Sequence, residues 1–98
     1  MFVVVQHRLT DPHAAFARGE RLKRGEGAPP DTRVLQFYPS QDGTLVTCLW
    51  KSRAVADVQS YVDETLGETS INLSYAVEAM AAFAQAPRGI AERPLVAP

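Results

Sequence analysis

Two hydrophobic periods alternate along this 98-residue chain, and their order constrains its fold more than any other feature of the sequence. Segments of alternating apolar and polar residues, rich in β-branched side chains, predict strands, whereas apolar residues at three- and four-residue steps predict helices. The expected elements are a strand at 2–9, a helix from 12 to 23 or 24, strands at 33–39 and 44–50, a helix at 53–66 and a strand at 71–77. The predicted order is therefore β-α-β-β-α-β.

Local signals mark where these elements begin and end. Thr10-Asp11-Pro12 supplies an N-cap and a first-turn proline for the first helix, and Gly25 can close that helix in a left-handed conformation. The turn Ser40-Gln41-Asp42-Gly43 predicts an antiparallel hairpin between the second and third strands. Ser52 is expected to cap the second helix, and Gly67 is expected to end it.

The alternation of side chains indicates which strands are central. Val3-Val4-Val5 and the strand at 44–50 place apolar groups on both faces, which is typical of central strands. In the strand at 33–39, Leu35 and Phe37 are expected to share one face. The last strand is expected to be an edge strand with one buried face, formed by Ile71, Leu73, Tyr75 and Val77.

Right-handed crossovers convert this order into an α+β, ferredoxin-like fold: an antiparallel four-stranded sheet of order 4-1-3-2 with both helices on one face. The open face of such a sheet is apolar on its central strands, so we expect a homodimer that pairs sheet to sheet. One domain is expected over 1–86. Within it, Glu78–Gln85 suits a short third helix, and 87–98, with three prolines and one glycine, is expected to form a flexible tail.

Composition and charge limit the classes of partner that we expect. The formal net charge is −1, so no basic field predicts a nucleic-acid or membrane-surface partner. The strand at 44–50 also lacks the aromatic signature with which a ferredoxin-like sheet binds RNA. The N-terminal apolar run is too short for a signal peptide or a membrane helix. The single cysteine, Cys48, excludes an internal disulfide, and a reducing cytoplasmic location is expected.

Four segments, FVVVQHRL, VLQFYPSQDGTLVTCLW, AVADVQSYVDETLG and INLSYAVE, make the chain from Phe2 to about Glu78 resemble the dimeric α/β-barrel superfamily of small bacterial proteins. The hairpin-helix-strand portion is most similar to an uncharacterised group that includes nickel-binding members. The resemblance implies a ferredoxin-like dimer, in a superfamily that contains cofactor-independent monooxygenases, haem-degrading enzymes, lactone isomerases and ligand binders. The second helix lacks the histidine of haem-binding members, and Trp50 is on a strand, not on the helix where small monooxygenases carry theirs.

Metal ligation is one candidate chemistry. His7, Asp11 and His13 lie within seven residues and offer two imidazoles and a carboxylate, ligands suited to Ni(II), Zn(II) or Fe(II). The alternative is structural, with Asp11 capping the first helix, His13 in solvent and His7 an ordinary sheet residue. The expected cofactor is therefore none, or a divalent metal such as nickel.

A small-molecule pocket between sheet and helices is the other candidate. Tyrosine and tryptophan tips can orient a flat apolar ligand there, although the same aromatic side chains also fill small cores. The candidate pocket residues are His7, Tyr38, Cys48, Trp50, Tyr61 and Tyr75. The cationic stretch of the first helix, Arg18 to Arg24, is interpreted as a solvated face.

The sequence therefore predicts a small-molecule or metal-ion binding or accessory protein. The alternative is a cofactor-independent monooxygenase or isomerase acting on an aromatic or polyketide-like molecule. A purely structural interaction module is a third class.

Overall fold

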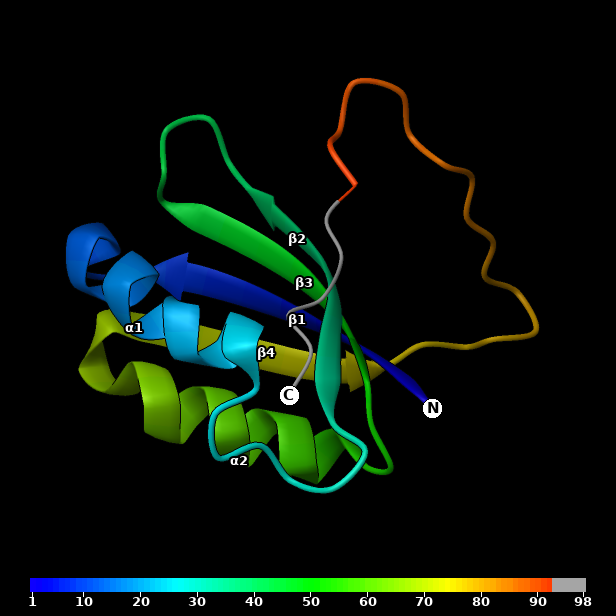
Figure 1. Cartoon of the computed structure of the whole chain (residues 1–98), viewed down its shortest axis with the longest axis horizontal. Coiled ribbons are helices and arrows are strands. Elements are labelled where there is room, and N and C mark those ends of the chain that lie inside the picture. Colours follow the sequence, from blue (N-terminus) through cyan, green and yellow to red (C-terminus); the bar gives the residue numbers. More distant parts are fainter. Residues whose placement is uncertain (93–98) are drawn as a thin grey trace.

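The computed structural model describes residues 1–92 and confirms the β-α-β-β-α-β order (Figure 1). Its elements are β1 (Phe2–Leu9), α1 (Pro12–Arg24), β2 (Arg33–Pro39), β3 (Leu45–Lys51), α2 (Val55–Leu66), a short 3-10 helix η1 (Gly67–Thr69) and β4 (Ser70–Ala76). The sheet has the order β2-β3-β1-β4, with antiparallel pairing throughout. Both helices cover one face of this sheet (Figure 1), so the predicted ferredoxin-like α+β architecture is confirmed.

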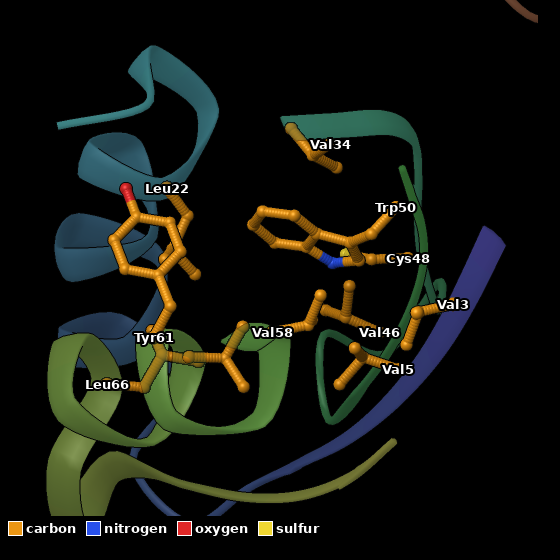
Figure 2. Close-up of a cluster of buried hydrophobic side chains, with 11 residues drawn as sticks. Val3, Val5, Leu22, Val34, Val46, Cys48, Trp50, Val58, Tyr61 and Leu66 are labelled. Atoms are coloured by element: carbon orange, nitrogen blue, oxygen red, sulfur yellow. The ribbon is translucent and has the colours of Figure 1, made fainter. Parts of the chain in front are cut away.

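The core lies between that face and the helices. Val5 of β1 is paired with Cys48 of β3 and Ser74 of β4, which makes β1 central, and the same register turns Val3 toward the helices. In Figure 2 the Trp50 indole extends from β3 into the core toward α1 and α2. It meets the Tyr61 ring edge-on, with centroids 5.9 Å apart. Burial of these aliphatic and aromatic side chains supplies the main favourable term in folding.

Helix α1 begins and ends as the sequence predicts. Asp11 Oδ1 accepts a hydrogen bond from the Ala14 backbone N–H at 3.2 Å, and Gly25 closes the helix with φ +71°. The prediction for the second helix was wrong at its start, because α2 begins at Val55 and its N-cap, Ala54, makes no side-chain cap. The Ser52 hydroxyl is instead buried against the Thr32 hydroxyl, 2.8 Å away, which places it before the helix.

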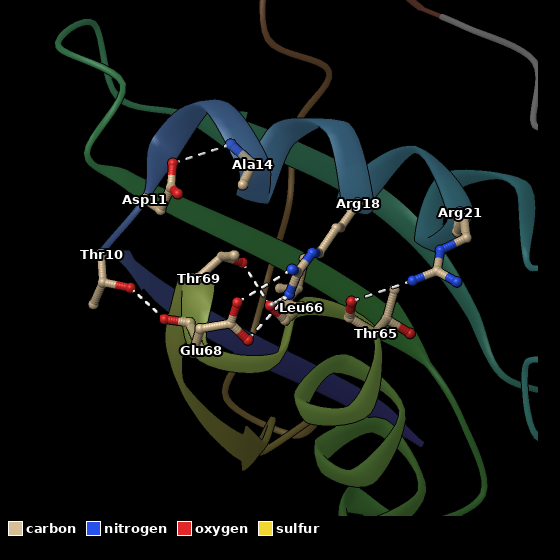
Figure 3. Close-up of polar contacts among 9 residues, drawn as sticks. All are labelled: Thr10, Asp11, Ala14, Arg18, Arg21, Thr65, Leu66, Glu68 and Thr69. Carbon is tan, nitrogen blue, oxygen red and sulfur yellow. Dashed lines mark hydrogen bonds and ion pairs between the residues drawn. The ribbon is translucent and has the colours of Figure 1, made fainter.

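Cationic side chains of α1 join the two helices, which corrects the interpretation of a purely solvated face (Figure 3). Arg18 donates to the Leu66 carbonyl at 3.0 Å and to the Glu68 carboxylate, and Arg21 donates to the Thr65 carbonyl. These arginines satisfy carbonyls at the C-terminal end of α2, where a helix has acceptors without intrahelical partners.

A β-bulge corrects the predicted faces of β2. Val34 is paired with Trp50 but Gln36 with Leu49, so β2 carries one extra residue, Leu35. The extra residue changes the alternation, so that Phe37, not Leu35, shares the helix-facing side with Val34.

The apolar side of strand β4 faces away from the helices, contrary to the expectation that it would be buried. Ile71, Leu73 and Tyr75 lie on the open face, 53%, 62% and 46% exposed. The helix-facing side of β4 instead carries Ser70, Asn72 and Ser74. The Asn72 side chain bonds to His7 of β1 and to Asp63 of α2, and the Ser70 hydroxyl bonds to Asn72. The expectation of a buried apolar face was therefore wrong for a single copy of the chain.

After β4 the described chain has no regular structure. Residues 78–85 form turns and irregular chain, so the expected third helix is absent there. Met80 and Phe83 in this segment are 95% and 93% exposed. The predicted tail begins at 87, and its residues 93–98 lie outside the described part of the structure. No helix within residues 1–92 has the length and hydropathy needed to cross a membrane.

Candidate functional site

A cavity of about 40 Å³ lies between α1 and the sheet. Its walls come from α1, from Leu66 at the end of α2 and from the inner sides of β1, β2 and β3. Phe16, Lys23 and Phe37 border it and are only half-buried, so they mark where it approaches the surface. The volume is well below the ~300 Å³ or more of pockets that hold drug-sized ligands. As it stands, the space suits a group of only a few atoms.

Gly19 of α1 contributes to this space by having no side chain. It lies on the inner side of the helix with Ala15 and Leu22, and it lines the cavity. A Cβ built at this position would meet no atom within 4 Å. A glycine inside a helix destabilises it by about 0.5–1 kcal/mol relative to alanine. The backbone conformation and the surroundings therefore do not require the glycine.

The walls of the cavity are mostly apolar and partly aromatic. The Phe16 and Phe37 rings meet edge-on with centroids 6.4 Å apart, and Lys23 Nζ lies 4.2 Å from the centre of the Phe37 ring. Trp50 also lines the cavity, and its buried Nε1–H has no hydrogen-bond partner among the residues that the structure describes. Such unpartnered buried donors are rare in folded proteins.

His7 is a buried polar side chain of the same wall. It is 4% exposed and faces the helices from β1. Its Nδ1 lies 2.6 Å from the Asn72 side-chain oxygen on β4. The Asn72 amide nitrogen donates to the Asp63 carboxylate of α2 at 2.8 Å. A chain of hydrogen bonds therefore runs from α2 through β4 to the imidazole.

This chain fixes the tautomer of His7. A carboxylate only accepts, so the Asn72 nitrogen must face Asp63 and the Asn72 oxygen must face the imidazole. That oxygen also accepts from the Ser70 hydroxyl at 2.6 Å. Since an amide oxygen cannot donate, His7 Nδ1 carries the hydrogen, and the lone pair of the neutral ring is on Nε2.

Burial keeps this imidazole neutral. Desolvation lowers the pKa of His7 from 6.5, against the opposing effects of the Asn72 hydrogen bond and the Asp63 charge. At neutral pH the ring is therefore a proton acceptor at Nε2, for which no described residue supplies a donor.

Gln59 holds the polar chain in place from α2. Its amide nitrogen donates to both Asp63 oxygens at 3.0 Å and to the Asn72 carbonyl at 3.1 Å. Its amide oxygen accepts from the Ser74 backbone N–H at 3.1 Å. These contacts fix the position of β4 against α2, and hence the position of Asn72 beside His7.

Cys48 is a packing residue in this geometry. It lines the cavity from β3, and burial raises the pKa of its thiol to about 12. The thiol therefore stays protonated at neutral pH, and the reactive thiolate is not formed.

The structure brings three of the six candidate pocket residues, His7, Cys48 and Trp50, to this cavity. Tyr61 lies in the core and donates its hydroxyl hydrogen to the Glu26 carbonyl at 2.6 Å. The other two, Tyr38 and Tyr75, lie on the open face of the sheet.

The candidate metal ligands are not assembled. Asp11 caps α1 and His13 is exposed on that helix, whereas His7 points into the core. Within residues 1–92, no three or more His, Cys, Asp and Glu side chains come together as a metal-binding group.

The open face of the sheet is a second notable surface. Large apolar side chains on β1, β3 and β4 remain exposed there. On β4 they follow one another at every second residue, whereas the register places Arg8 of β1 between Leu45 of β3 and Ile71 of β4. The five most exposed, each between 40% and 62%, are Phe2, Leu45, Ile71, Leu73 and Tyr75. We call these five residues the open-face patch.

Sequence reasoning missed Gly19, Asn72, Asp63 and Lys23 as site residues. A signal for Asn72 was present, because the last strand alternates strictly and its polar positions had to occupy one whole face. The prediction placed that polar face in solvent, and Asn72 was therefore not considered as a site residue. No sequence signal separated Gly19 from an ordinary helix glycine.

Comparisons with known proteins identify no family for this chain. No protein-family model matches the chain, and no curated protein matches it. Among solved structures, Rv0793 from Mycobacterium tuberculosis aligns over 83% of this chain and 98% of its own, with 17% sequence identity and a TM-score of 0.42. A likeness of this size carries no functional argument.

Proposed function

We propose that the protein binds a compact, largely apolar small molecule beneath α1 and acts as a sheet-to-sheet homodimer of the dimeric α/β-barrel type. The observation that carries the proposal is Gly19. It is a helix-destabilising residue on an apolar wall where alanine would fit, so its absent side chain leaves room beside the cavity. Sites that bind ligands commonly retain such destabilising residues.

The position of the cavity favours entry of a ligand from the surface between α1 and β2. A cavity that holds benzene measures about 150 Å³. A ring of that size therefore requires the half-buried Phe16 and Phe37 to move outward. These two side chains lie at the opening, and their movement leaves the buried core beside Trp50 intact.

The ligand site is tested with a fragment library observed by NMR. We expect weak binders whose signals broaden with the wild-type protein and not with Gly19→Leu, which fills the cavity. Ala17→Leu is the matched control, because it adds the same side chain to the exposed side of α1. Binding that survives Gly19→Leu unchanged contradicts a site beneath α1. A nickel titration in the same series tests the metal-ion alternative.

The open-face patch supports the homodimer. Its β4 part, Ile71, Leu73 and Tyr75, runs continuously along the strand, and exposed apolar surface of this kind usually marks an interface. A net charge of −1 leaves little repulsion between two copies. A second copy presents the same patch, which is the requirement of a two-fold interface. The free thiol of Cys48 suits a reducing compartment, so we also propose a cytoplasmic location.

The dimer is tested by molar mass in solution. Two chains of 10.7 kDa give ~21 kDa, and Leu73→Arg on the patch is expected to give monomers. Ala17→Arg, on the exposed side of α1, is the matched control and is expected to remain dimeric. A wild-type mass of one chain at all concentrations contradicts the dimer.

One observation favours the enzymatic alternative, a cofactor-independent isomerase or monooxygenase. His7 is neutral at neutral pH and its tautomer is held by Asn72, and histidine is the side chain that most often serves as a general base. The small cavity gives no corresponding support for a bulky polycyclic substrate.

A further inference from the structure

We propose that the protein has a second binding site, at the end of the sheet where β2 begins and β3 ends, and that this site takes a small molecule carrying a phosphate group. No residue of the site lines the cavity beneath α1, and all of its residues come from one copy of the chain. The site therefore depends neither on that cavity nor on the proposed homodimer. In Figure 1 this end of the sheet is the one beside the N-terminus.

A surface pocket of about 550 Å³ lies at this end of the sheet. Ligand-binding pockets commonly measure ~300–1,000 Å³, so this one has room for a small organic molecule. Polar as well as apolar atoms reach its surface. Three of its lining residues are cationic, Arg33, Lys51 and Arg53, and one, Asp31, is anionic. We call this pocket the basic pocket.

Two of the cations are neighbours across the sheet. The register pairs Arg33 of β2 with Lys51 of β3. The adjacent residues Val34 and Trp50 are buried in the core, so the two cationic side chains leave the sheet together on its open side. Like charges directly opposite one another destabilise an antiparallel pair. Arg53, two residues after Lys51, adds a third positive charge to the same pocket, and an anion bound there would relieve the repulsion.

Ion pairing separates these cations from those of α1. Three cationic side chains of α1 and its C-cap region each form an ion pair with a glutamate. Among residues 1–92, none of the three cations of the basic pocket forms an ion pair, and Asp31 in the same pocket forms none either. Their positive charges are therefore available to an anion from solution.

The segments that carry the cations are fixed to one another without a ligand. The hydroxyls of Thr32 and Ser52, which precede Arg33 and Arg53, are 2.8 Å apart, and both side chains are buried. The Ser52 backbone N–H also donates to the Met1 carbonyl at 3.0 Å. The starts of β1 and β2 and the end of β3 are thus held together, which lowers the entropic cost of binding at this place.

A phosphate group suits this arrangement. A guanidinium group binds phosphate oxygens through two parallel N–H donors, and a lysine ammonium binds them as a point charge. A phosphate group on an organic molecule carries almost two negative charges at neutral pH, so it can interact with more than one of the cations. The Asp31 carboxylate repels the phosphate but can accept hydrogen bonds from hydroxyl groups in the rest of the ligand.

The test is a titration with glycerol 3-phosphate, inorganic phosphate and glycerol at neutral pH and constant ionic strength, followed by the backbone amide NMR signals. We expect glycerol 3-phosphate to shift the signals of residues 31–33 and 51–53 and to bind at least about twofold more tightly than inorganic phosphate. Glycerol should shift none of them. Lys51→Gln should weaken the binding of glycerol 3-phosphate about fivefold. Arg8→Gln is the matched control, because it removes the same charge from an exposed side chain at the other end of β1.

A second variant should change the affinity in the opposite direction. Asp31 has φ +58°, a conformation that asparagine also adopts, so Asp31→Asn should fold normally. Removing its negative charge should strengthen the binding of glycerol 3-phosphate about twofold. A variant that merely disturbs the structure would not bind more tightly.

Three results would overturn the inference. The first is the absence of shifts at 31–33 and 51–53 with millimolar glycerol 3-phosphate. The second is an equal loss of affinity in Arg8→Gln and Lys51→Gln, which would show a general charge effect. The third is equal affinity for inorganic phosphate and glycerol 3-phosphate, which would exclude a role for the organic part. Each of them leaves the proposed site beneath α1 and the proposed homodimer untouched.

Discussion

Replacing Gly19 with alanine is predicted to stabilise the protein. The substitution removes the helix penalty of an interior glycine, about 1 kcal/mol. The new methyl group meets no atom within 4 Å and enters a half-buried space. Partial burial of that methyl adds up to about 0.8 kcal/mol. The free energy of unfolding should therefore rise by about 1–2 kcal/mol.

The assay is urea unfolding followed by circular dichroism, with wild type and variant at one protomer concentration, because the stability of the proposed dimer depends on concentration. The midpoint should rise while the denaturant slope stays constant. In thermal unfolding, each 1 kcal/mol should raise the Tm by ~4–8 °C for a domain of this size.

Gly25→Ala, at the residue that closes the same helix, is the matched control. Its Cβ also meets nothing within 4 Å, but Gly25 has φ +71°. Alanine is strained in that conformation, so this variant should lose about 1 kcal/mol. If Gly19→Ala also destabilises the protein, the space beside Gly19 is not open and the reasoning for the site fails.

Three further predictions concern other parts of the chain. Gly67→Ala should lower the free energy of unfolding in urea by about 1–2 kcal/mol. The reason is strain, because Gly67 has φ +54° and a Cβ there would lie 3.0 Å from Arg18 Nη1. An unchanged free energy of unfolding would refute this strain. Cys48, with its pKa raised to about 12, should resist alkylation at pH 8 when folded and react when unfolded; rapid reaction of the native protein would contradict its burial. The free energy of unfolding should decline as the pH falls below 6.5, because His7 then binds a proton in the unfolded chain but not in the folded protein. His7→Gln should make the free energy of unfolding depend less on pH in this range. An identical pH dependence in the variant would show that other groups cause it.

The order of the elements was predictable because it depends on local periodicity and on turn chemistry. The run FVVVQHRL and the Asp42-Gly43 turn each specify their element without help from distant residues. The orientation of β4 was not predictable in this way, since strict alternation shows that one face is apolar but not what covers it. The apolar face of β4 lies away from the helices, where the proposed second copy would cover it.

The candidate site was less predictable than the fold for a physical reason. His7 was visible as a titratable residue on a strand, but its tautomer depends on Asn72 and Asp63, more than fifty residues later in the chain. The space beside Gly19 arises only where α1 packs on the sheet. Both features are tertiary, so neither leaves a local pattern in the sequence.

The site beneath α1 is tested most directly with xenon, a small apolar probe that enters dry cavities. In crystals of the wild-type protein under xenon pressure, we predict a bound atom between α1 and β3, beside Gly19 and Trp50. The atom should be absent from crystals of Gly19→Leu. A wild-type crystal with no xenon at this place would contradict the account.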